Sequence, residues 1–405
     1  MESPERTIFH CDCDAFFASV EETFHPEYKN QPMAVAGDPE NRHGIILAKN
    51  ALAKRCGVKT AETIWSARQK CPGLLLAPPR HHTYGEFCRR VNLIYAQYTD
   101  RVEPFSIDES FLDLTGCLHL FGDAENPAAL AHRIRKQVER ELGVTISVGV
   151  SWNKAFAKLG SDRNKPNNIC CITPANFTQT VWPLPVGEFF GVGKNTAESL
   201  RKWGILTIGD LARADALFLQ RHLGKQGAQL HLCANGLDTS PVVPAGQGEA
   251  VKSVGNSITF KRDLTTQRDI RTGVLALADS VASRLRAQNL KCRTVQVTIK
   301  DAALKSIQRQ KQCPHPTDLA AELTRTALEL IAETWQPMRP IRLLCITAQN
   351  LLPADEATQQ LSLFDAPGGD AQKNERLEQT MDHIREKYGN GSILPGAVVK
   401  NDLGI

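Results

Sequence analysis

Hydrophobic positions in the N-terminal half of the chain switch between the spacing of buried strands and the spacing of helices. In chain order, the pattern predicts a strand at 6–11, a helix at 16–24, two short strands at 102–106 and 110–114 around a tight turn at 107–109, a helix at 128–142, a strand at 144–150 and a helix from Asn153. Strands and helices that alternate in this way indicate an α/β core.

A second series of elements follows the Pro- and Gly-rich segment 240–248, which is typical of a linker. The pattern predicts strands at 253–260, 293–300, 305–312 and 340–349, with helices at 268–288 and 318–333. Their order is βαββαβ. In the second strand Val295, Val297 and Ile299 alternate with polar residues, so one face is apolar and the other offers hydrogen-bond donors. A short helix is also expected at 374–388.

Two further segments of the chain predict separate subdomains. Residues 22–78 form an insertion rich in helix formers, and residues 186–237 are helical and punctuated by glycine. With the linker at 240–248, this organisation predicts a multidomain protein of mixed α/β and α+β class.

Composition limits the class of protein. The chain has 405 residues, of which 42% are hydrophobic and 23% charged, so two to four domains with ordinary cores are expected. No apolar run has the length of a signal peptide or a membrane span. The 12 cysteines lack the repeated spacing of a disulfide framework. We therefore expect a soluble, cytoplasmic protein with reduced thiols and no membrane contact.

Charge is distributed unevenly along the chain. The net charge is +4, but residues 251–312 contain 13 Lys and Arg against 4 Asp and Glu, which leaves the remainder at −5. Such a block is either a solvated face or a site for a polyanion. The polar strand face within it favours a phosphate backbone.

Two acidic clusters are candidates for divalent cations. Asp12 and Asp14 follow the first strand, and Asp108 and Glu109 lie at the turn between the two short strands. Phosphoryl transfer by two Mg²⁺ ions requires carboxylate oxygens that converge within a few ångströms. The alternative is that these residues cap helices or face water, which sequence spacing alone does not exclude. A zinc site is not expected, because no Cys-x-x-Cys pair is present.

Two long motifs resemble those of a known family. The run Asp-Cys-Asp-Ala-Phe-Phe-Ala-Ser-Val-Glu-Glu at 12–22, followed by Ser-Ile-Asp-Glu-Ser-Phe-Leu-Asp at 106–113, is similar to the catalytic motifs of Y-family DNA polymerases, specifically the bacterial DinB (DNA polymerase IV) branch. The resemblance continues through 147–158 and 162–166 and covers roughly residues 5–365. It implies a template-directed, low-fidelity translesion DNA polymerase that adds dNTPs to a primer 3′-hydroxyl and acts as a monomer. No segment resembles an exonuclease.

The resemblance also implies a right-hand architecture with a linked second DNA-binding domain. The expected domains are a palm at 1–22 and 79–170, fingers at 23–78, a thumb with a helix-hairpin-helix at 171–239, a linker at 240–250, a little finger at 251–350 and a C-terminal tail at 351–405. The βαββαβ order predicted from the pattern agrees with the little-finger assignment.

Site residues follow from the matched positions. Asp12, Asp108 and Glu109 are expected to be catalytic and to hold two Mg²⁺ ions together with the backbone carbonyl of Cys13. The substrate-binding residues are expected to be Phe16, Phe17, Lys54 and Lys165. Phe17 matches the steric gate that packs under the sugar, although without the resemblance it reads as a core residue. Lys165 is expected to meet the triphosphate, and Asp14 to serve structure.

One segment departs from the family pattern. The family has Asn-Tyr-x-Ala-Arg in the fingers, whereas this chain has Asn-Ala-Leu-Ala-Lys at 50–54. Lys54 keeps the positive charge but lacks the planar, bidentate fork of arginine, and Ala51 replaces the tyrosine. We therefore expect weaker control of the triphosphate.

Contacts with DNA and with a partner protein are expected outside the core. Gly191, Gly193 and Lys194 resemble a helix-hairpin-helix, in which glycines let backbone N–H groups approach a phosphate. The residues Gln360, Leu361, Leu363 and Phe364 are similar to the motif by which bacterial polymerases bind the sliding clamp. The alternative is that these apolar residues pack on their own domain.

Two other functions compete with the polymerase. The changes at Ala51 and Lys54 leave open a catalytically weak, polymerase-derived subunit that binds DNA and the clamp. A two-metal nuclease or cyclase would explain the carboxylates but not Phe17 or the clamp-like peptide.

Overall fold

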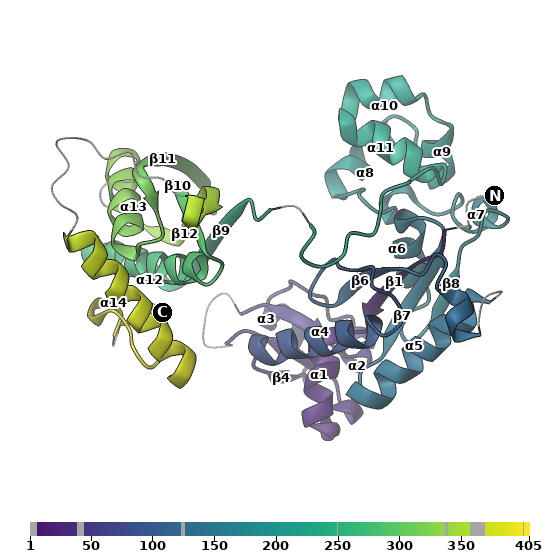
Figure 1. Ribbon diagram of the computed structural model, residues 1–405, viewed down its shortest axis with the longest axis horizontal. Coiled ribbons are helices and arrows are strands. Elements are labelled where there is room, and N and C mark those ends of the chain that lie inside the picture. Colours follow the sequence, from purple (N-terminus) through teal and green to yellow (C-terminus); the bar gives the residue numbers. More distant parts are fainter. Residues whose placement is uncertain are drawn as a thin grey trace. The chain divides into compact units, whose positions relative to one another are not determined.

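A computed structural model describes residues 6–38, 44–122, 126–248, 250–336, 339–356, 369–399 and 401–405, and the side chains of 369–372 are not described. The chain separates into two compact units (Figure 1). The N-terminal unit comprises Met1–Pro39 and Gly44–Gly248, and the C-terminal unit comprises mainly Glu249–Ile405. Each unit is a mixture of helices and strands, as predicted for a multidomain α/β and α+β protein.

A five-stranded sheet forms the centre of the N-terminal unit. Its strands are, in spatial order, β5 (Val102–Pro104), β6 (Glu109–Asp113), β1 (Ile8–Cys13), β7 (Ile146–Ser151) and β8 (Ile169–Cys171). Every residue of β1 is buried, because helices cover both faces of the sheet. The first strand was expected to end at Cys11 but continues to Cys13. Asp12 therefore lies inside the ladder, directly opposite Glu109 of β6.

Helices on the two faces of this sheet have different partners. The helices of the N-terminal unit around the sheet are α1 (Phe16–Phe24), α4 (His81–Tyr95), α5 (Pro127–Leu142) and α6 (Lys154–Asp162). Apolar residues of the first three share one core cluster with alternate residues of β1, including Phe9 and Cys11. The opposite face of β1 contributes Ile8, which packs with Phe111 and with Ala157 of α6. The helix starts predicted at 16, 128 and 153 lie within one residue of the observed starts.

The segment between α1 and α4 contains a small sheet that the sequence did not predict. Its elements are β2 (Met33–Ala36), β3 (Ile46–Lys49), α2 (Ala51–Arg55), α3 (Ile64–Lys70) and β4 (Leu75–Ala77), with sheet order β3-β2-β4. These strands have three or four residues each, which is too short for an alternating pattern to stand out. The sequence was described only as rich in helix formers, and this description missed the three strands.

The rest of the N-terminal unit is helical, as the pattern predicted. It contains α7 (Phe177–Thr180), α8 (Lys194–Lys202), α9 (Ile208–Arg213), α10 (Ala216–Leu223) and α11 (Lys225–Ala234). These helices have their own apolar cluster, which also includes Phe156 and Leu159 of α6. The helical segment is thus packed against the back of the sheet through α6.

The C-terminal unit confirms the predicted βαββαβ order. Its elements are β9 (Ser253–Leu264), α12 (Gln267–Arg286), β10 (Leu290–Asp301), β11 (Ser306–Thr317), α13 (Ala320–Thr334) and β12 (Ile341–Pro353). The sheet is antiparallel with order β11-β10-β12-β9, and α12 and α13 share its core. Val295, Val297 and Ile299 are buried, whereas Gln296 and Thr298 between them are half-buried. The alternation read from the sequence therefore has the two faces expected.

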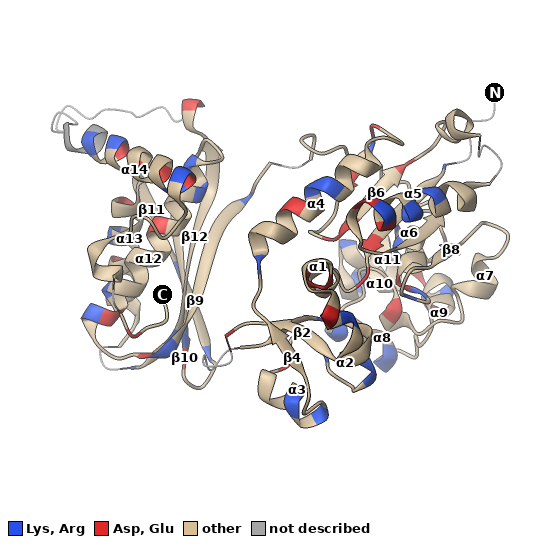
Figure 2. Ribbon diagram, turned by 90° about the horizontal axis from the view of Figure 1, so that it is seen from below, with Lys and Arg blue, Asp and Glu red and all other residues tan. Residues whose placement is uncertain are grey.

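Residues after the C-terminal sheet pack back onto it. Helix α14 (Gly369–Tyr388) lies beside α12 and carries interleaved acidic and basic residues (Figures 1 and 2). Arg286 of α12 is bonded to Glu378 and to Asp382, and Arg385 of α14 is bonded to Asp279. Beyond the helix, Leu403 joins the apolar core. This C-terminal extension, to which the sequence analysis assigned no role, completes the C-terminal unit.

Within the described ranges, the longest helices are too polar or too short to cross a bilayer.

Candidate functional site

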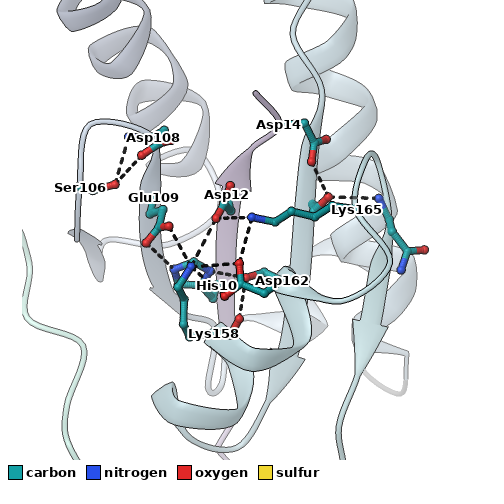
Figure 3. Close-up of polar contacts among 12 residues, drawn as sticks. His10, Asp12, Asp14, Ser106, Asp108, Glu109, Lys158, Asp162 and Lys165 are labelled. Carbon is teal, nitrogen blue, oxygen red and sulfur yellow. Dashed lines mark hydrogen bonds and ion pairs between the residues drawn. The ribbon is translucent and has the colours of Figure 1, made fainter. Parts of the chain in front are cut away.

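The strand register of the N-terminal unit brings two acidic side chains together. Asp12 of β1 lies opposite Glu109 of β6, so both carboxylates leave the sheet at the same level. Two lysines face them (Figure 3). Lys165 Nζ is 2.6 Å from Asp12 Oδ2, and Lys158 Nζ is 2.8 Å from Glu109 Oε1 and 3.4 Å from Asp12 Oδ2.

A third carboxylate lies at the outer side of these lysines. Asp162 Oδ1 is 3.0 Å from Lys165 Nζ, and Asp162 Oδ2 is 3.1 Å from Lys158 Nζ. Asp162 is half exposed, whereas Asp12 is 7% exposed at its side chain. Acidic and basic groups therefore alternate from the buried end of the site to its surface.

Asp108 points away from this cluster. Its Oδ1 accepts a hydrogen bond of 2.6 Å from Ser106 Oγ, within the turn that precedes β6 (Figure 3). The Asp108 carbonyl accepts a hydrogen bond of 2.9 Å from the Cys13 amide, which ties the turn to the end of β1. Across the described ranges, no three Asp, Glu, His or Cys side chains are gathered closely enough to hold one ion. The structure thus brings Asp12 and Glu109 together and leaves the Asp108 side chain apart.

His10, which the sequence did not single out, lies below Glu109. It is fully buried, and its Nδ1 is 2.7 Å from Ser161 Oγ. Its Nε2 is 3.6 Å from Glu109 Oε2 and has no hydrogen-bond partner. A histidine inside an otherwise apolar strand was the sequence signal for this residue, because a buried polar group requires a partner.

Burial and neighbouring charges shift the pKa values of the Asp12 and Glu109 carboxyl groups in opposite directions. Burial raises the pKa of Asp12, and Lys165 offsets only part of this effect. Burial acts on Glu109 in the same direction, but the neighbouring His10 ring and a hydrogen bond from Lys158 hold its pKa below the usual range. Burial also opposes the charge of Lys158 and Lys165, yet the carboxylates raise the pKa of both. The ionised form of Asp12 is therefore the one that an additional positive charge would stabilise most.

Asp14 has a different environment from Asp12. Its Oδ1 accepts a hydrogen bond from Ser147, and its Oδ2 accepts hydrogen bonds from Thr145 and from the Asn167 amide. These bonds join three segments of the chain near β7. The geometry agrees with the structural role expected for this residue.

A pocket of about 470 Å³ adjoins the carboxylates. The expected substrate-binding residues Phe16, Phe17, Lys54 and Lys165 all line it, as do Lys49 and Ala51. The ring of Phe17 is stacked on Tyr84 at a centroid distance of 4.1 Å. Phe16 is 3% exposed and packs mainly in the core. The pocket therefore has acidic, aromatic and basic walls.

Asn50 holds the basic wall in position. Its side-chain oxygen accepts hydrogen bonds from the amides of Ala53 and Met33, which caps α2 and fixes it to β2. Its amide nitrogen donates to Glu22 and to the Gln31 carbonyl. Lys54 projects from this helix and is exposed, and Lys49 Nζ donates to Thr60 at 2.9 Å.

The glycines expected to contact DNA lie before α8. Gly191 has φ of 84°, which favours glycine, and Gly193 is the N-cap of α8 without a side-chain cap. Lys194 is the first residue of the helix and is exposed. The first N–H groups of α8 are thus accessible to an anion. The expected clamp-binding residues Gln360, Leu361, Leu363 and Phe364 lie outside the described residues.

Comparisons with known proteins agree along nearly the whole chain. Residues 11–162 match the model of the impB/mucB/samB family, and residues 251–363 match its C-terminal domain. A protein of Acetivibrio thermocellus named DNA polymerase IV is 44% identical over 98% of each chain. One of Bacillus subtilis named DNA polymerase IV 1 is 36% identical over 99% of this chain and 95% of its own.

A solved structure has the same fold. It is a Y-family DNA polymerase chimera of Dbh and Dpo4, with a TM-score of 0.75 and 25% identity, and the match covers 85% of this chain and 99% of that chain.

Proposed function

Because the chain belongs to the impB/mucB/samB family of Y-family DNA polymerases, we propose that it extends a primer by a two-metal reaction and is recruited by the sliding clamp. The family and its similarity to DNA polymerase IV proteins support a translesion, DNA-directed DNA polymerase, whose substrates are primer-template DNA and dNTPs. The observation that carries this proposal is the pocket next to Asp12 and Glu109, which is lined by carboxylates, an aromatic ring and lysines.

The donors at this pocket suit a hard divalent cation. Asp12, Asp108 and Glu109 offer carboxylate oxygens, and the Cys13 carbonyl belongs to the same strand end. Mg²⁺ prefers oxygen ligands of this kind. These four residues would hold two Mg²⁺ ions. The ions would lower the pKa of the primer 3′-hydroxyl and stabilise negative charge on the phosphates.

Side chains on the other walls bind and orient the nucleotide. Lys165 and Lys54 neutralise the triphosphate, Lys54 as a point charge without the fork of arginine. Phe17 packs under the sugar, where its ring leaves no room for a 2′-hydroxyl. Because Ala51 is small, one side of the pocket constrains the nucleotide less, which agrees with low fidelity.

The remaining parts of the chain bind DNA and the clamp. In this proposal the central sheet is the palm, 23–78 the fingers, 171–239 the thumb and 251–350 the little finger. The basic segment 251–312 and the accessible α8 terminus at Gly191, Gly193 and Lys194 contact phosphates, so binding is independent of sequence and weakens with salt. Residues 360–364 dock in the clamp through Leu363 and Phe364.

A catalytically weak binding subunit is the second candidate, favoured by Ala51 and Lys54 in the pocket wall. Primer extension on undamaged and abasic templates separates the two candidates. The wild type should extend in the presence of Mg²⁺, and an Asp108→Ala/Glu109→Ala double variant should not. Glu139→Gln, at a half-buried residue of α5 outside the pocket, is the matched control. Wild-type protein that binds DNA but does not extend the primer would favour the binding subunit.

A further inference from the structure

The ammonium of Lys158 lies between carboxylates of two different strands. It contacts Glu109 of β6 and Asp12 of β1, at the distances given above, and Asp162 on its own helix (Figure 3). The Lys158 side chain is 13% exposed. Lysine is rarely so buried unless it is paired, so these contacts fix its position.

The close packing of α6 on the sheet places Lys158 there. Gly149 of β7 faces this helix, and a Cβ atom at this position would lie 1.9 Å from the Ala157 carbonyl oxygen. Only glycine allows this approach. Asn153 caps the helix by accepting a hydrogen bond from the Phe156 amide, which sets the turn on which Lys158 lies. Both features direct the lysine toward the carboxylates.

The contacts of Lys158 use the oxygens that a divalent cation requires. Glu109 Oε1 and Asp12 Oδ2 each accept a hydrogen bond from the Lys158 ammonium. A divalent cation bound to these oxygens would lie close to the Lys158 ammonium, and the two positive charges would repel each other. An oxygen lone pair that accepts a hydrogen bond from Lys158 cannot bind the cation at the same time. Lys165 also contacts Asp12, but the proposed function assigns it to the triphosphate. Lys158 differs from Lys165 in that it contacts Glu109 as well as Asp12.

We propose that Lys158 is a positioning residue, a built-in counter-ion that holds Glu109 next to Asp12 and competes with divalent cations for their oxygens. The inference rests on the proposed metal site. It predicts that this chain binds divalent cations weakly until a bound nucleotide provides phosphate oxygens as further ligands. A residue that only supported the fold would not oppose cation binding.

The test is a titration of the full-length protein with Mn²⁺ alone, with free Mn²⁺ measured by electron paramagnetic resonance. Lys158→Met should lower the Kd for Mn²⁺ by about tenfold, since it removes one unit charge in contact with the ligands. Lys154→Met is the matched control, because Lys154 lies one turn earlier and pairs with Glu103. Its Kd should remain that of the wild type. Unchanged or weaker binding in Lys158→Met overturns the proposal.

Two more variants separate this inference from the metal site itself. Asp12→Asn should lose Mn²⁺ binding; if it binds as the wild type does, the metal site and the role of Lys158 both fail. If binding depends on Asp12 but not on Lys158, only the present inference fails.

If Lys158→Met does not fold, Lys158→Arg tests the same inference in the opposite direction. A bidentate guanidinium should raise the Kd for Mn²⁺ several-fold, and a Kd at or below the wild-type value contradicts the competition.

Discussion

The ring of Phe17 lies nearly parallel to the ring of Tyr84, with 4.1 Å between centroids and 14° between planes. Tyr84 is fully buried, and its hydroxyl donates a hydrogen bond of 2.6 Å to Glu21 Oε1. Arg80 donates to both oxygens of the same carboxylate. The wall of the pocket at Phe17 is therefore backed by a ring that cannot easily move.

This stack leads to a prediction on sugar selectivity. Phe17→Ala should raise the efficiency of ribonucleotide incorporation relative to dNTPs, because the ring that excludes the 2′-hydroxyl is gone. Tyr84→Leu should give a smaller change in the same direction, since Phe17 loses the stacked ring that holds it. The measurement is the ratio of kcat/KM for a ribonucleotide and its dNTP. Tyr84→Phe keeps the ring and is the control. Unchanged selectivity in Phe17→Ala would make Phe17 a packing residue.

A second prediction concerns the basic wall. Lys54→Ala should raise the KM for dNTPs by about tenfold or more, because the loss of one hydrogen bond to a charged group costs about 1.5–3 kcal/mol. Lys54→Arg should lower KM, because the guanidinium binds phosphate in a bidentate manner. Steady-state extension with a single dNTP measures both. Lys136→Ala, at an exposed lysine of α5, should leave KM unchanged. An unchanged KM in Lys54→Ala would remove Lys54 from the site.

A third prediction concerns recruitment. Deletion of 360–364 should abolish stimulation by the sliding clamp and leave basal primer extension unchanged. Single-turnover extension with and without loaded clamp is the measurement. Leu363→Ala with Phe364→Ala should reproduce the deletion, because these residues are the proposed pocket anchors. Loss of basal extension in either variant would mean that the segment is structural.

A fourth prediction concerns the C-terminal extension. Leu403 is 2% exposed in the core of the C-terminal unit, and its carbonyl accepts a hydrogen bond of 2.9 Å from the Lys261 amide of β9. Leu403→Ala should lower the free energy of unfolding of this unit by about 2–5 kcal/mol, as for other buried leucines. Leu394→Ala, at a residue that is 43% exposed, is the matched control and should cost much less. Calorimetry of the full chain would show the difference; equal Tm values for both variants would contradict the packing described here.

Much of the fold could be predicted because its signals are local. The alternation of Val295, Val297 and Ile299 identified a two-faced strand, and the βαββαβ order followed from such patterns. Helix α5 was placed to within a residue, whereas helix α4 was not predicted. Strands β2, β3 and β4 were missed, because strands of three or four residues are too short to show a period of alternation. Only their pairing with one another reveals them as a sheet.

The sequence by itself determined which residue types the site has: the acidic clusters were evident along the chain, and the resemblance of its motifs implied Phe17 and Lys165. Only the tertiary structure decided which of these groups meet. Antiparallel register, a property of two strands separated by about 100 residues, sets Asp12 against Glu109. The approach of α6 at Gly149 adds Lys158, and a buried Ser161 holds His10. These contacts depend on distances across the sheet, which the order of residues along one strand does not contain.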